Sequence, residues 1–213
     1  MSLWSLLCTS FVVGLSGALM PGPLLVATIK GTYLCGPLAG PLVTLGHGLL
    51  ELAAVLALAF GLGRFVSNDL VMATVGSAGG IVLIFLGWGM IRDVVRGRIA
   101  PVETGRAELP GRFGPIINGL VASIVNPYWI VWWLTIGASY VLLSLERGWV
   151  GLPFFYTGHI LSDLVWLTAV SVALSQGKRL IGPRFYAGLI LGCGLFLIGL
   201  AGWFIYSGVT ALT

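Results

Sequence analysis

Long apolar stretches separated by short polar segments run through the whole chain. Asp, Glu, Lys and Arg are all absent from residues 1–29, 70–91, 113–145 and 185–213. Each of these stretches reaches the ~20 residues that an apolar helix needs to cross a bilayer. Two more apolar stretches, about 41–63 and 151–175, each contain one carboxylate and one histidine. All six are continuously apolar rather than alternating, and this pattern predicts helices instead of strands.

We therefore predict an all-α membrane protein with six transmembrane helices. The expected spans are 4–29, 41–63, 70–91, 113–143, 151–175 and 186–209. Apolar residues make up 58% and charged residues 8% of the 213 positions, whereas soluble domains carry about 25% charged residues. This composition excludes an ordinary soluble domain. The first stretch is kept as a span because it lacks the basic segment that opens a signal peptide.

Basic residues are concentrated on one side of the predicted membrane. Nine of the eleven Lys and Arg residues, including Lys30, fall in the loops after spans one, three and five. The other two, Arg64 and Arg147, fall on the opposite side. Because cytoplasmic loops carry the excess of Lys and Arg, we expect a multi-pass protein of the cytoplasmic membrane with both termini outside. The net charge of +4 is then a topology signal, and no nucleic-acid partner is expected.

The two halves of the chain resemble each other at a constant offset. The only two histidines, His47 and His159, lie 112 positions apart, and a carboxylate follows each of them four residues later. These carboxylates are Glu51 in the first half and Asp163 in the second. We therefore divide the chain into a first three-helix repeat, a cytoplasmic linker loop and a second three-helix repeat, at 1–91, 92–112 and 113–213. Three is an odd number of spans, so the halves enter the membrane with opposite polarity, and a 3+3 inverted-topology repeat is typical of secondary transporters.

Glu51 and Asp163 are the only carboxylates inside the predicted spans. A carboxylate at the centre of a span costs about 2.5–3.5 kcal/mol on insertion scales, so it usually marks an ion, proton or substrate pathway. His47 and His159 each lie one turn before an acid, on the same helix face. We predict that these four residues bind substrate or protons near the membrane midplane. The alternative is that both acids are neutral and only hydrogen-bond across the helix bundle.

Two proline motifs interrupt the predicted spans. Pro21, Gly22 and Pro23 lie in the first span, and Asn126 and Pro127 lie in the fourth. Proline removes an intrahelical hydrogen bond and clashes with the preceding turn, so both helices should kink or open at these motifs. The freed backbone groups can bind ions or the charged ends of a substrate, although a kink without a ligand is an alternative. Asn126 is a further binding candidate, since its amide both donates and accepts hydrogen bonds.

These motifs, together with the glycine-rich second span, resemble the LysE/RhtB family of amino-acid exporters over essentially the whole chain. The resemblance implies efflux of amino acids and related small metabolites, driven by the membrane potential or a proton gradient. It also implies that the translocation site is lined or shaped by Pro21, Gly22, Pro23, Asn126 and Pro127. Many members carry Lys after Asn-Pro, whereas Tyr128 stands here. The paired Gly-His-x3-Glu/Asp elements indicate a distinct subgroup.

The expected function is proton-coupled export of an amino acid or similar small amine, without enzymatic activity or a cofactor. The expected partners are the small-molecule substrate, protons and the lipid bilayer, and the question of a homodimer stays open. The wider superfamily includes heavy-metal exporters. One alternative is therefore export of a divalent cation bound by His47, Glu51, His159 and Asp163. Another is an intramembrane serine protease in which Ser16, in a Gly-x-Ser-Gly pattern, is the nucleophile and His159 is the base.

Overall fold

The computed structural model describes residues 1–61, 69–97, 113–177 and 183–210. Within these ranges the regular structure is helical, with no strand, as the continuously apolar stretches predict. Most of the predicted linker loop at 92–112, from residue 98 onward, lies outside the described residues.

The described part of the first half contains four α-helices and one 3-10 turn. They are α1 (Leu3–Ala18), α2 (Pro23–Cys35), the short 3-10 turn η1 (Gly36–Leu38), α3 (Ala39–Ala59) and α4 (Asp69–Val95). The second half is built of α5 (Gly114–Ile124), α6 (Pro127–Trp132), the π-helical segment η3 (Trp133–Gly137), α7 (Ala138–Leu145), α8 (Gly151–Gln176) and α9 (Pro183–Thr210). The helices α3, α4, α8 and α9 begin and end within a few residues of the predicted limits.

The first and fourth predicted spans are interrupted at their proline motifs. α1 gives way to α2 at Gly22, an extended residue with φ −154° and ψ −169°. α5 gives way to α6 at Asn126, whose side-chain oxygen accepts from the N–H of Tyr128 at 3.2 Å. Pro23 and Pro127 take the first helical position, where a missing N–H is harmless and the fixed φ suits a helix. Each motif therefore ends one helix and begins another.

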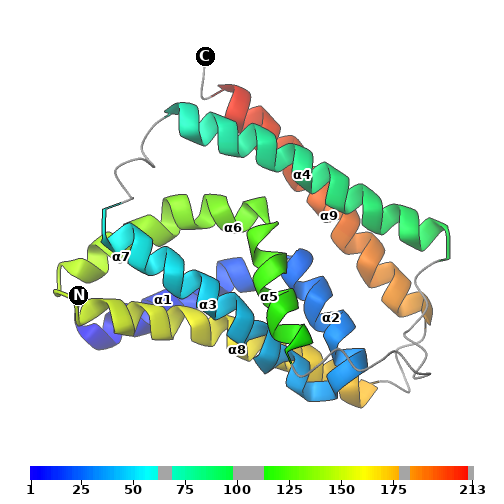
Figure 1. Cartoon of the computed structure of the whole chain (residues 1–213), viewed down its shortest axis with the longest axis horizontal. Helices are drawn as coiled ribbons and strands as arrows, with labels where there is room; N and C mark the ends of the chain where they lie inside the picture. The colour runs from blue at the N-terminus through cyan, green and yellow to red at the C-terminus, as the bar shows by residue number, and fades with distance from the viewer. Residues whose placement is uncertain (62–68, 98–112, 178–182, 211–213) are drawn as a thin grey trace.

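Helices from the two halves pack against each other in corresponding pairs. α4 packs along α9, α1 packs along α8, and α3 packs along α5. α3 also packs against α8, so the two helices with the histidines meet inside the bundle. Figure 1 shows α4 and α9 side by side as one layer, with the other helices gathered beside it.

Two glycines let the paired helices approach closely. A Cβ atom on Gly46 of α3 would overlap the carbonyl group of Ile116 on α5. A Cβ atom on Gly158 of α8 would overlap the carbonyl group of Leu7 on α1. Small residues allow close helix contacts in membrane proteins generally. Because each glycine directly precedes a histidine in the sequence, these contacts set the depth of both histidines in the bundle.

A buried apolar cluster lies beside the histidines. Leu6, Val55, Trp133 and Phe155 belong to it and are almost fully buried. A second cluster joins α2 to α8 and α9 through Leu25, Ile29, Leu174, Ile190 and Cys193. Residues of α3 and α8, the helices that bear the predicted titratable residues, therefore contribute to this apolar packing.

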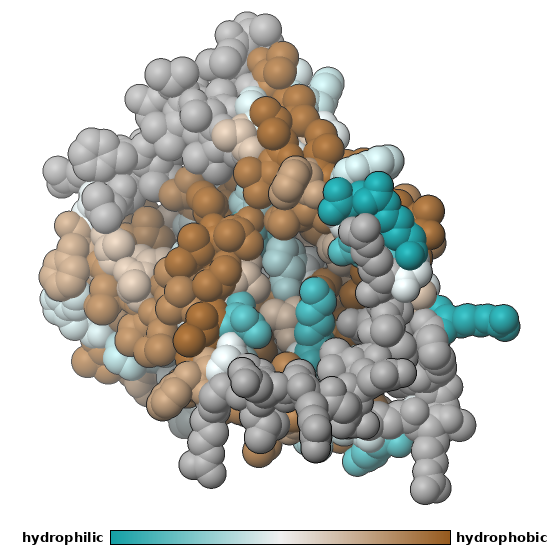
Figure 2. Space-filling model, turned by 45° about the vertical axis from the view of Figure 1, so that its right-hand side comes forward, coloured by the Kyte–Doolittle hydropathy of each residue, from teal (hydrophilic) through white to brown (hydrophobic). Residues whose placement is uncertain are grey.

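In the part of the chain that the structure describes, three helical segments are long and apolar enough to cross a membrane, namely Pro23–Ala59, Pro127–Leu145 and Gly151–Gln176. α1, α5 and part of α9 are apolar but shorter. Large apolar side chains such as Phe85 and Trp4 are more than two-thirds exposed, and Figure 2 shows hydrophobic residues, in brown, over much of the coloured part of one face. A surface of this kind is suited to lipid, and the chain is a membrane protein.

Lys30 is an exception to the predicted loop pattern. It lies inside α2 and not in a loop after the first span, so that placement is wrong. The same correction applies to Arg92 and Arg184, which were also expected in loops and lie inside α4 and α9. The helix that begins after the break at Gly22 continues beyond the predicted end of the span at residue 29 and ends at Cys35, so that it includes Lys30.

Candidate functional site

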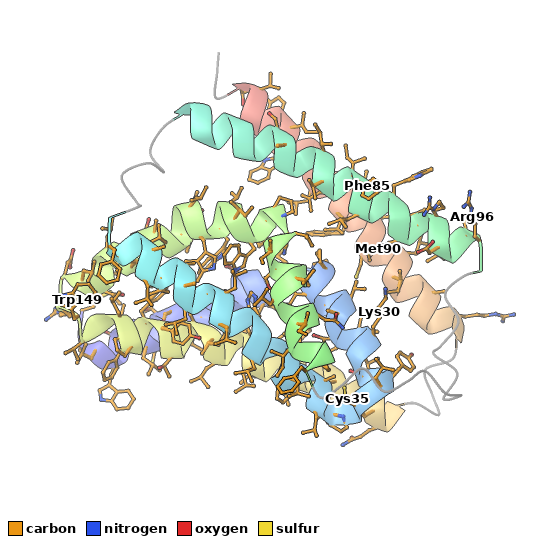
Figure 3. All side chains as sticks on the ribbon, viewed as in Figure 1. Lys30, Cys35, Phe85, Met90, Arg96 and Trp149 are labelled. Carbon is orange, nitrogen blue, oxygen red and sulfur yellow. The ribbon has the colours of Figure 1, made fainter. Side chains whose placement is uncertain are left out.

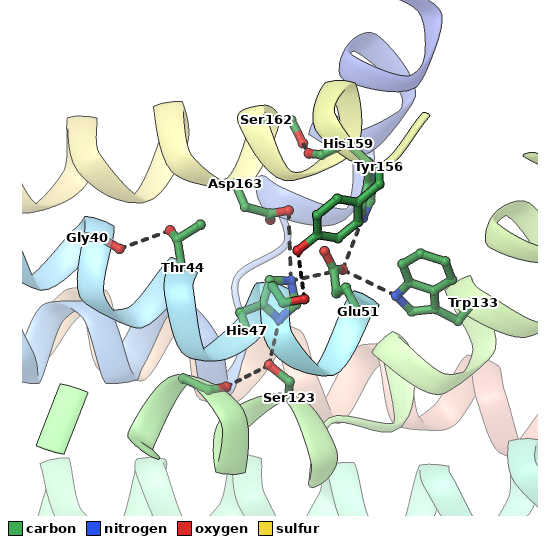
Figure 4. A network of polar contacts seen from close by, with 12 residues as sticks. Gly40, Thr44, His47, Glu51, Ser123, Trp133, Tyr156, His159, Ser162 and Asp163 are labelled. Carbon is green, nitrogen blue, oxygen red and sulfur yellow. Dashed lines mark hydrogen bonds and ion pairs between the residues drawn. The ribbon is translucent and has the colours of Figure 1, made fainter. Parts of the chain in front are cut away.

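The four predicted titratable residues lie together inside the bundle. His47 and Glu51 come from α3, and His159 and Asp163 come from α8. Their relative exposures are 4%, 2%, 3% and 3%, respectively. Burying such groups is costly unless they pair with one another. Figure 4 shows the four side chains facing each other across the contact between the two helices.

Glu51 is at the centre of this network. Its Oε1 lies 3.0 Å from Nε2 of His47, one turn earlier on the same helix. The same oxygen lies 3.0 Å from Nε2 of His159 on α8. The indole N–H of Trp133 also donates to it, at 3.2 Å. Hydrogen bonds to a charged group are roughly twice as strong as those between neutral groups, so these three contacts can stabilise a Glu51 carboxylate in an apolar interior. Both imidazoles are also close enough to Glu51 to exchange a proton with it.

Asp163 has fewer partners than Glu51. Its Oδ2 lies 3.8 Å from Nε2 of His47, beyond hydrogen-bonding distance. Within the described part of the chain, this oxygen, Oε2 of Glu51 and Nδ1 of His159 have no hydrogen-bond partner. Unpaired buried polar atoms are uncommon because they cost free energy. These three atoms can therefore form hydrogen bonds with a ligand.

Two further polar side chains complete the network, and no sequence motif indicated them. Oγ of Ser123 on α5 lies 2.6 Å from Nδ1 of His47. Trp133 lies at the start of the π-helical segment η3, next to Trp132. Both tryptophans are buried, although consecutive residues of a regular helix point in different directions. The π-helical segment therefore brings both rings to the site.

Aromatic rings enclose the imidazole of His159. Trp132 stacks on it, with ring centroids 4.5 Å apart and planes 25° apart. Trp133 presents its edge with centroids 5.4 Å apart, and Phe155 lies at 5.9 Å. The face of an aromatic ring attracts a cation. This enclosure therefore suits a protonated imidazole as well as a neutral one.

A cavity joins the network to the two helix breaks. Seven of the nine predicted site residues line it, namely Pro21, Gly22, His47, Glu51, Asn126, His159 and Asp163. Pro23 and Pro127 do not line it, and they begin the helices beside it. Its volume is about 50 Å³, which is room for about three to five water molecules. We call it the central cavity.

The central cavity also contains a potential set of metal ligands. His47, Glu51 and Asp163 each offer one ligand atom, and these atoms lie within 4.8 Å of one another. Imidazole nitrogen and carboxylate oxygen suit divalent transition metals. His159 is not a member of this group within the described residues. The geometry therefore accommodates three of the four ligands in the metal-export alternative.

Ser16 lacks the surroundings of a nucleophile. Its hydroxyl donates to the carbonyl of Val13 at 2.6 Å and accepts from the indole N–H of Trp132 at 3.4 Å. Nε2 of His159 contacts Glu51 instead, and no hydrogen bond joins Ser16 to His159 in the part of the chain that the structure describes. A nucleophilic serine needs a base within hydrogen-bond reach, so the geometry gives the protease alternative no support.

Comparison with known proteins places these features in a family. The chain is 24% identical over 202 residues, 94% of its length and 95% of the relative's, to a protein of Bacillus subtilis (strain 168) named "Putative amino acid efflux protein YcgF". No solved structure gives a significant match. The profile of the LysE type translocators matches residues 15–208, which include both helix breaks and all four titratable residues. The chain therefore belongs to the LysE type translocators, a family of membrane transport proteins.

Proposed function

We propose that the protein is a secondary transporter that exports an amino acid or similar small amine across the cytoplasmic membrane, coupled to protons. One observation carries the proposal. The buried side chains of His47, Glu51, His159 and Asp163 converge from two helices on one cavity. Buried ionisable groups in membrane helices usually serve ion, proton or substrate pathways. Family membership supports transport, and the name of the relative supports efflux of an amino acid.

In the proposed architecture the chain crosses the membrane six times, as a 3+3 inverted repeat with both termini outside. α1 with α2, then α3 and α4, form the first half. α5 with α6 and α7, then α8 and α9, form the second. The packing of α1 on α8 and of α5 on α3 supports this arrangement, because a pseudo-two-fold axis would interchange the two pairs. Transport then consists of a movement of the halves about the central cavity.

The substrate's ammonium group is expected to bind at Oε2 of Glu51 and Oδ2 of Asp163. Both oxygens are buried and unpaired, and both residues line the central cavity. None of the described Lys and Arg residues lines this cavity, so the substrate's carboxylate is expected to use neutral groups. The amide of Asn126 and the N-terminus of α2 at Gly22 are available there, and helix N-termini favour anions. In a widened central cavity, an α-amino acid is therefore expected to bind with its ammonium group at the two acids and its carboxylate at Asn126 and Gly22.

Protons and the ammonium group compete for the same acids in this proposal. Departure of the substrate leaves Glu51 and Asp163 without a cation, and a proton can then take its place. Such exchange drives transport only if the two conformations of the protein bind the two ligands differently. A volume of about 50 Å³ is too small for an amino acid, so loading requires the central cavity to widen.

Uptake into inverted membrane vesicles tests the proposal. The panel is radiolabelled L-alanine, L-leucine, L-lysine and L-glutamate, with and without a proton gradient that is acidic inside the vesicle. We expect the wild type to accumulate at least one of them in response to the gradient. Glu51→Gln and Asp163→Asn should fold and lower the initial rate at least tenfold. Full activity of both variants, or no uptake by the folded wild type, would contradict the proposal.

Export of a divalent cation is a second candidate, favoured by the three clustered ligand atoms of His47, Glu51 and Asp163. Trp129 and Trp132 line the same cavity, so bound Ni²⁺ or Co²⁺ should quench tryptophan fluorescence. Saturable quenching that His47→Gln abolishes, together with uptake of the metal and none of the amino acids, would establish this candidate. Amino-acid uptake without such quenching would exclude it.

A further inference from the structure

A second and larger cavity lies between α2, α4 and α5. Its volume is about 340 Å³, at the lower end of the roughly 300–1,000 Å³ that ligand pockets span. Its lining includes Pro23, Val26 and Lys30 of α2, Met90 of α4 and Asn118 of α5. Figure 3 shows Lys30 and Met90 on the two helices that face each other there. We call this cavity the Lys30 cleft.

Among the residues that the structure describes, Lys30 is the only Lys or Arg that lines the central cavity or the Lys30 cleft. It lies on α2, five residues before the end of that helix at Cys35. No carboxylate of the described residues lies within ion-pair distance of it. The side chains of Lys30 and Asn118 are both exposed, so a ligand in this open cleft can reach them. Asn118 adds an amide donor, so the cleft has complementary charge for a small anion.

One face of α2 connects the Lys30 cleft to the central cavity. Residues 23, 26, 27 and 30 all line the cleft, and their spacing is that of a single helix face. Gly22, adjacent to Pro23, lines the central cavity. Lys30 and Gly22 are eight residues apart, which is about 12 Å along a helix axis. A substrate therefore has about two helical turns to travel between the two cavities.

We propose that the Lys30 cleft is an entry site, in which Lys30 and Asn118 bind the carboxylate of an amino-acid substrate before it reaches the central cavity. The inference rests on the proposed export and adds an earlier site to it. The cleft has room for a whole amino acid, whereas the central cavity has not. The two sites are complementary to opposite ends of the substrate. Lys30 attracts the carboxylate first, and Glu51 and Asp163 then attract the ammonium group.

A lysine close to the membrane surface can also act only as a topology anchor. Arg96 offers a matched control, because it lies just beyond the end of α4, on the same predicted side, and lines neither cavity. Figure 3 shows it pointing away from the bundle. An anchor role predicts similar effects of the two cations on orientation. An entry-site role predicts that Lys30 alone affects the substrate concentration needed for transport.

Initial transport rates in proteoliposomes distinguish the two roles. The full chain is purified and reconstituted, and the probes are L-leucine and L-alanine. Lys30→Gln and Lys30→Met should each raise KM about tenfold, equivalent to about 1.4 kcal/mol, and leave kcat within about twofold. Lys30→Arg should restore most of the lost affinity. Arg96→Gln should behave as the wild type does.

The possible contrary outcomes distinguish failure of the entry site from failure of the proposed export. Folded Lys30 variants with an unchanged KM would overturn the entry site and leave the proposed export intact. A wild type that transports none of the amino acids would overturn the export itself. Equal effects of the Lys30 and Arg96 variants, with inverted accessibility of an N-terminal tag to an impermeant protease, would assign Lys30 to anchoring. Inhibition by leucinamide, which has no carboxylate, should be insensitive to Lys30, and a tenfold loss there would also overturn the inference.

Discussion

His159 on α8 contacts Glu51 on α3, with Nε2 and Oε1 3.0 Å apart, and not Asp163 on its own helix. His47 reaches the same oxygen at the same distance. A single carboxylate therefore joins both histidines and both helices. Two acids that are equivalent in the sequence are consequently unequal in the structure: Glu51 holds the network together, and Asp163 is left available for a ligand.

This inequality predicts different stabilities for the two alanine variants. Glu51→Ala removes the acceptor of Trp133 and both histidines, and each unsatisfied buried donor costs about 1–3 kcal/mol. We expect a loss of about 3 kcal/mol or more in the free energy of unfolding. Asp163→Ala should change it by less than about 1 kcal/mol, because Asp163 makes no close hydrogen bond with another described side chain. Denaturation in detergent, followed by circular dichroism, measures both, and equal losses would refute the assignment.

Trp133→Phe should lower the stability and the transport rate of the protein without unfolding the helix bundle. The substitution keeps an aromatic ring and removes the N–H that donates to Glu51 at 3.2 Å. A hydrogen bond to a charged group contributes about 1.5–3 kcal/mol, so we expect a stability loss in that range and a transport rate reduced about tenfold. Trp166→Phe is the matched control, since the buried indole N–H of Trp166 has no hydrogen-bond partner among the residues that the structure describes. Equal stabilities and equal transport rates of the two variants would show that the indole N–H of Trp133 does not support Glu51.

Ser123→Ala should remove a hydrogen bond of the His47 imidazole and leave the rest of the site unchanged. The variant removes the hydroxyl that lies 2.6 Å from Nδ1 of His47, and a lost hydrogen bond of about 1 kcal/mol corresponds to a rate change of about fivefold. We expect slower transport and a changed ¹⁵N resonance of His47. Ser144→Ala serves as the control, because the buried Ser144 hydroxyl donates only to the carbonyl of Tyr140 on its own helix. An unchanged His47 resonance in the Ser123 variant would show that the contact is absent.

Alanine at either close-contact glycine should destabilise the bundle. The added methyl group at Gly46 or Gly158 would overlap a backbone carbonyl of the neighbouring helix, and overpacking typically costs about 1–3 kcal/mol. Gly192→Ala on α9 is the control, because nothing lies within 4 Å of a Cβ atom there. Thermal unfolding of the purified variants should therefore show lower midpoints for the first two only. A comparable decrease for Gly192→Ala would mean that the loss is not caused by the close contacts.

The candidate site was only partly predictable. The repeated histidine and acid elements indicated that Glu51 and Asp163 would meet, and they do lie on packed helices that line one cavity. Ser123 and Trp133 could not be found in this way, because neither belongs to a repeat or to a charged motif. Their roles depend on how α5 lies against α3 and on the π-helical turn, which are consequences of packing.

By itself the sequence determined the helical class, the helix breaks and the identity of the four titratable residues. These follow from composition, from the need of a chain in lipid to satisfy its own backbone hydrogen bonds, and from the stereochemistry of proline. Only the tertiary structure decided that His159 pairs with Glu51 and that Lys30 faces a cleft. The pairing depends on how closely the helices approach at Gly46 and Gly158, and the cleft depends on how α2, α4 and α5 lie relative to one another. That geometry is the sum of many distant contacts, and no local pattern in the sequence contains it.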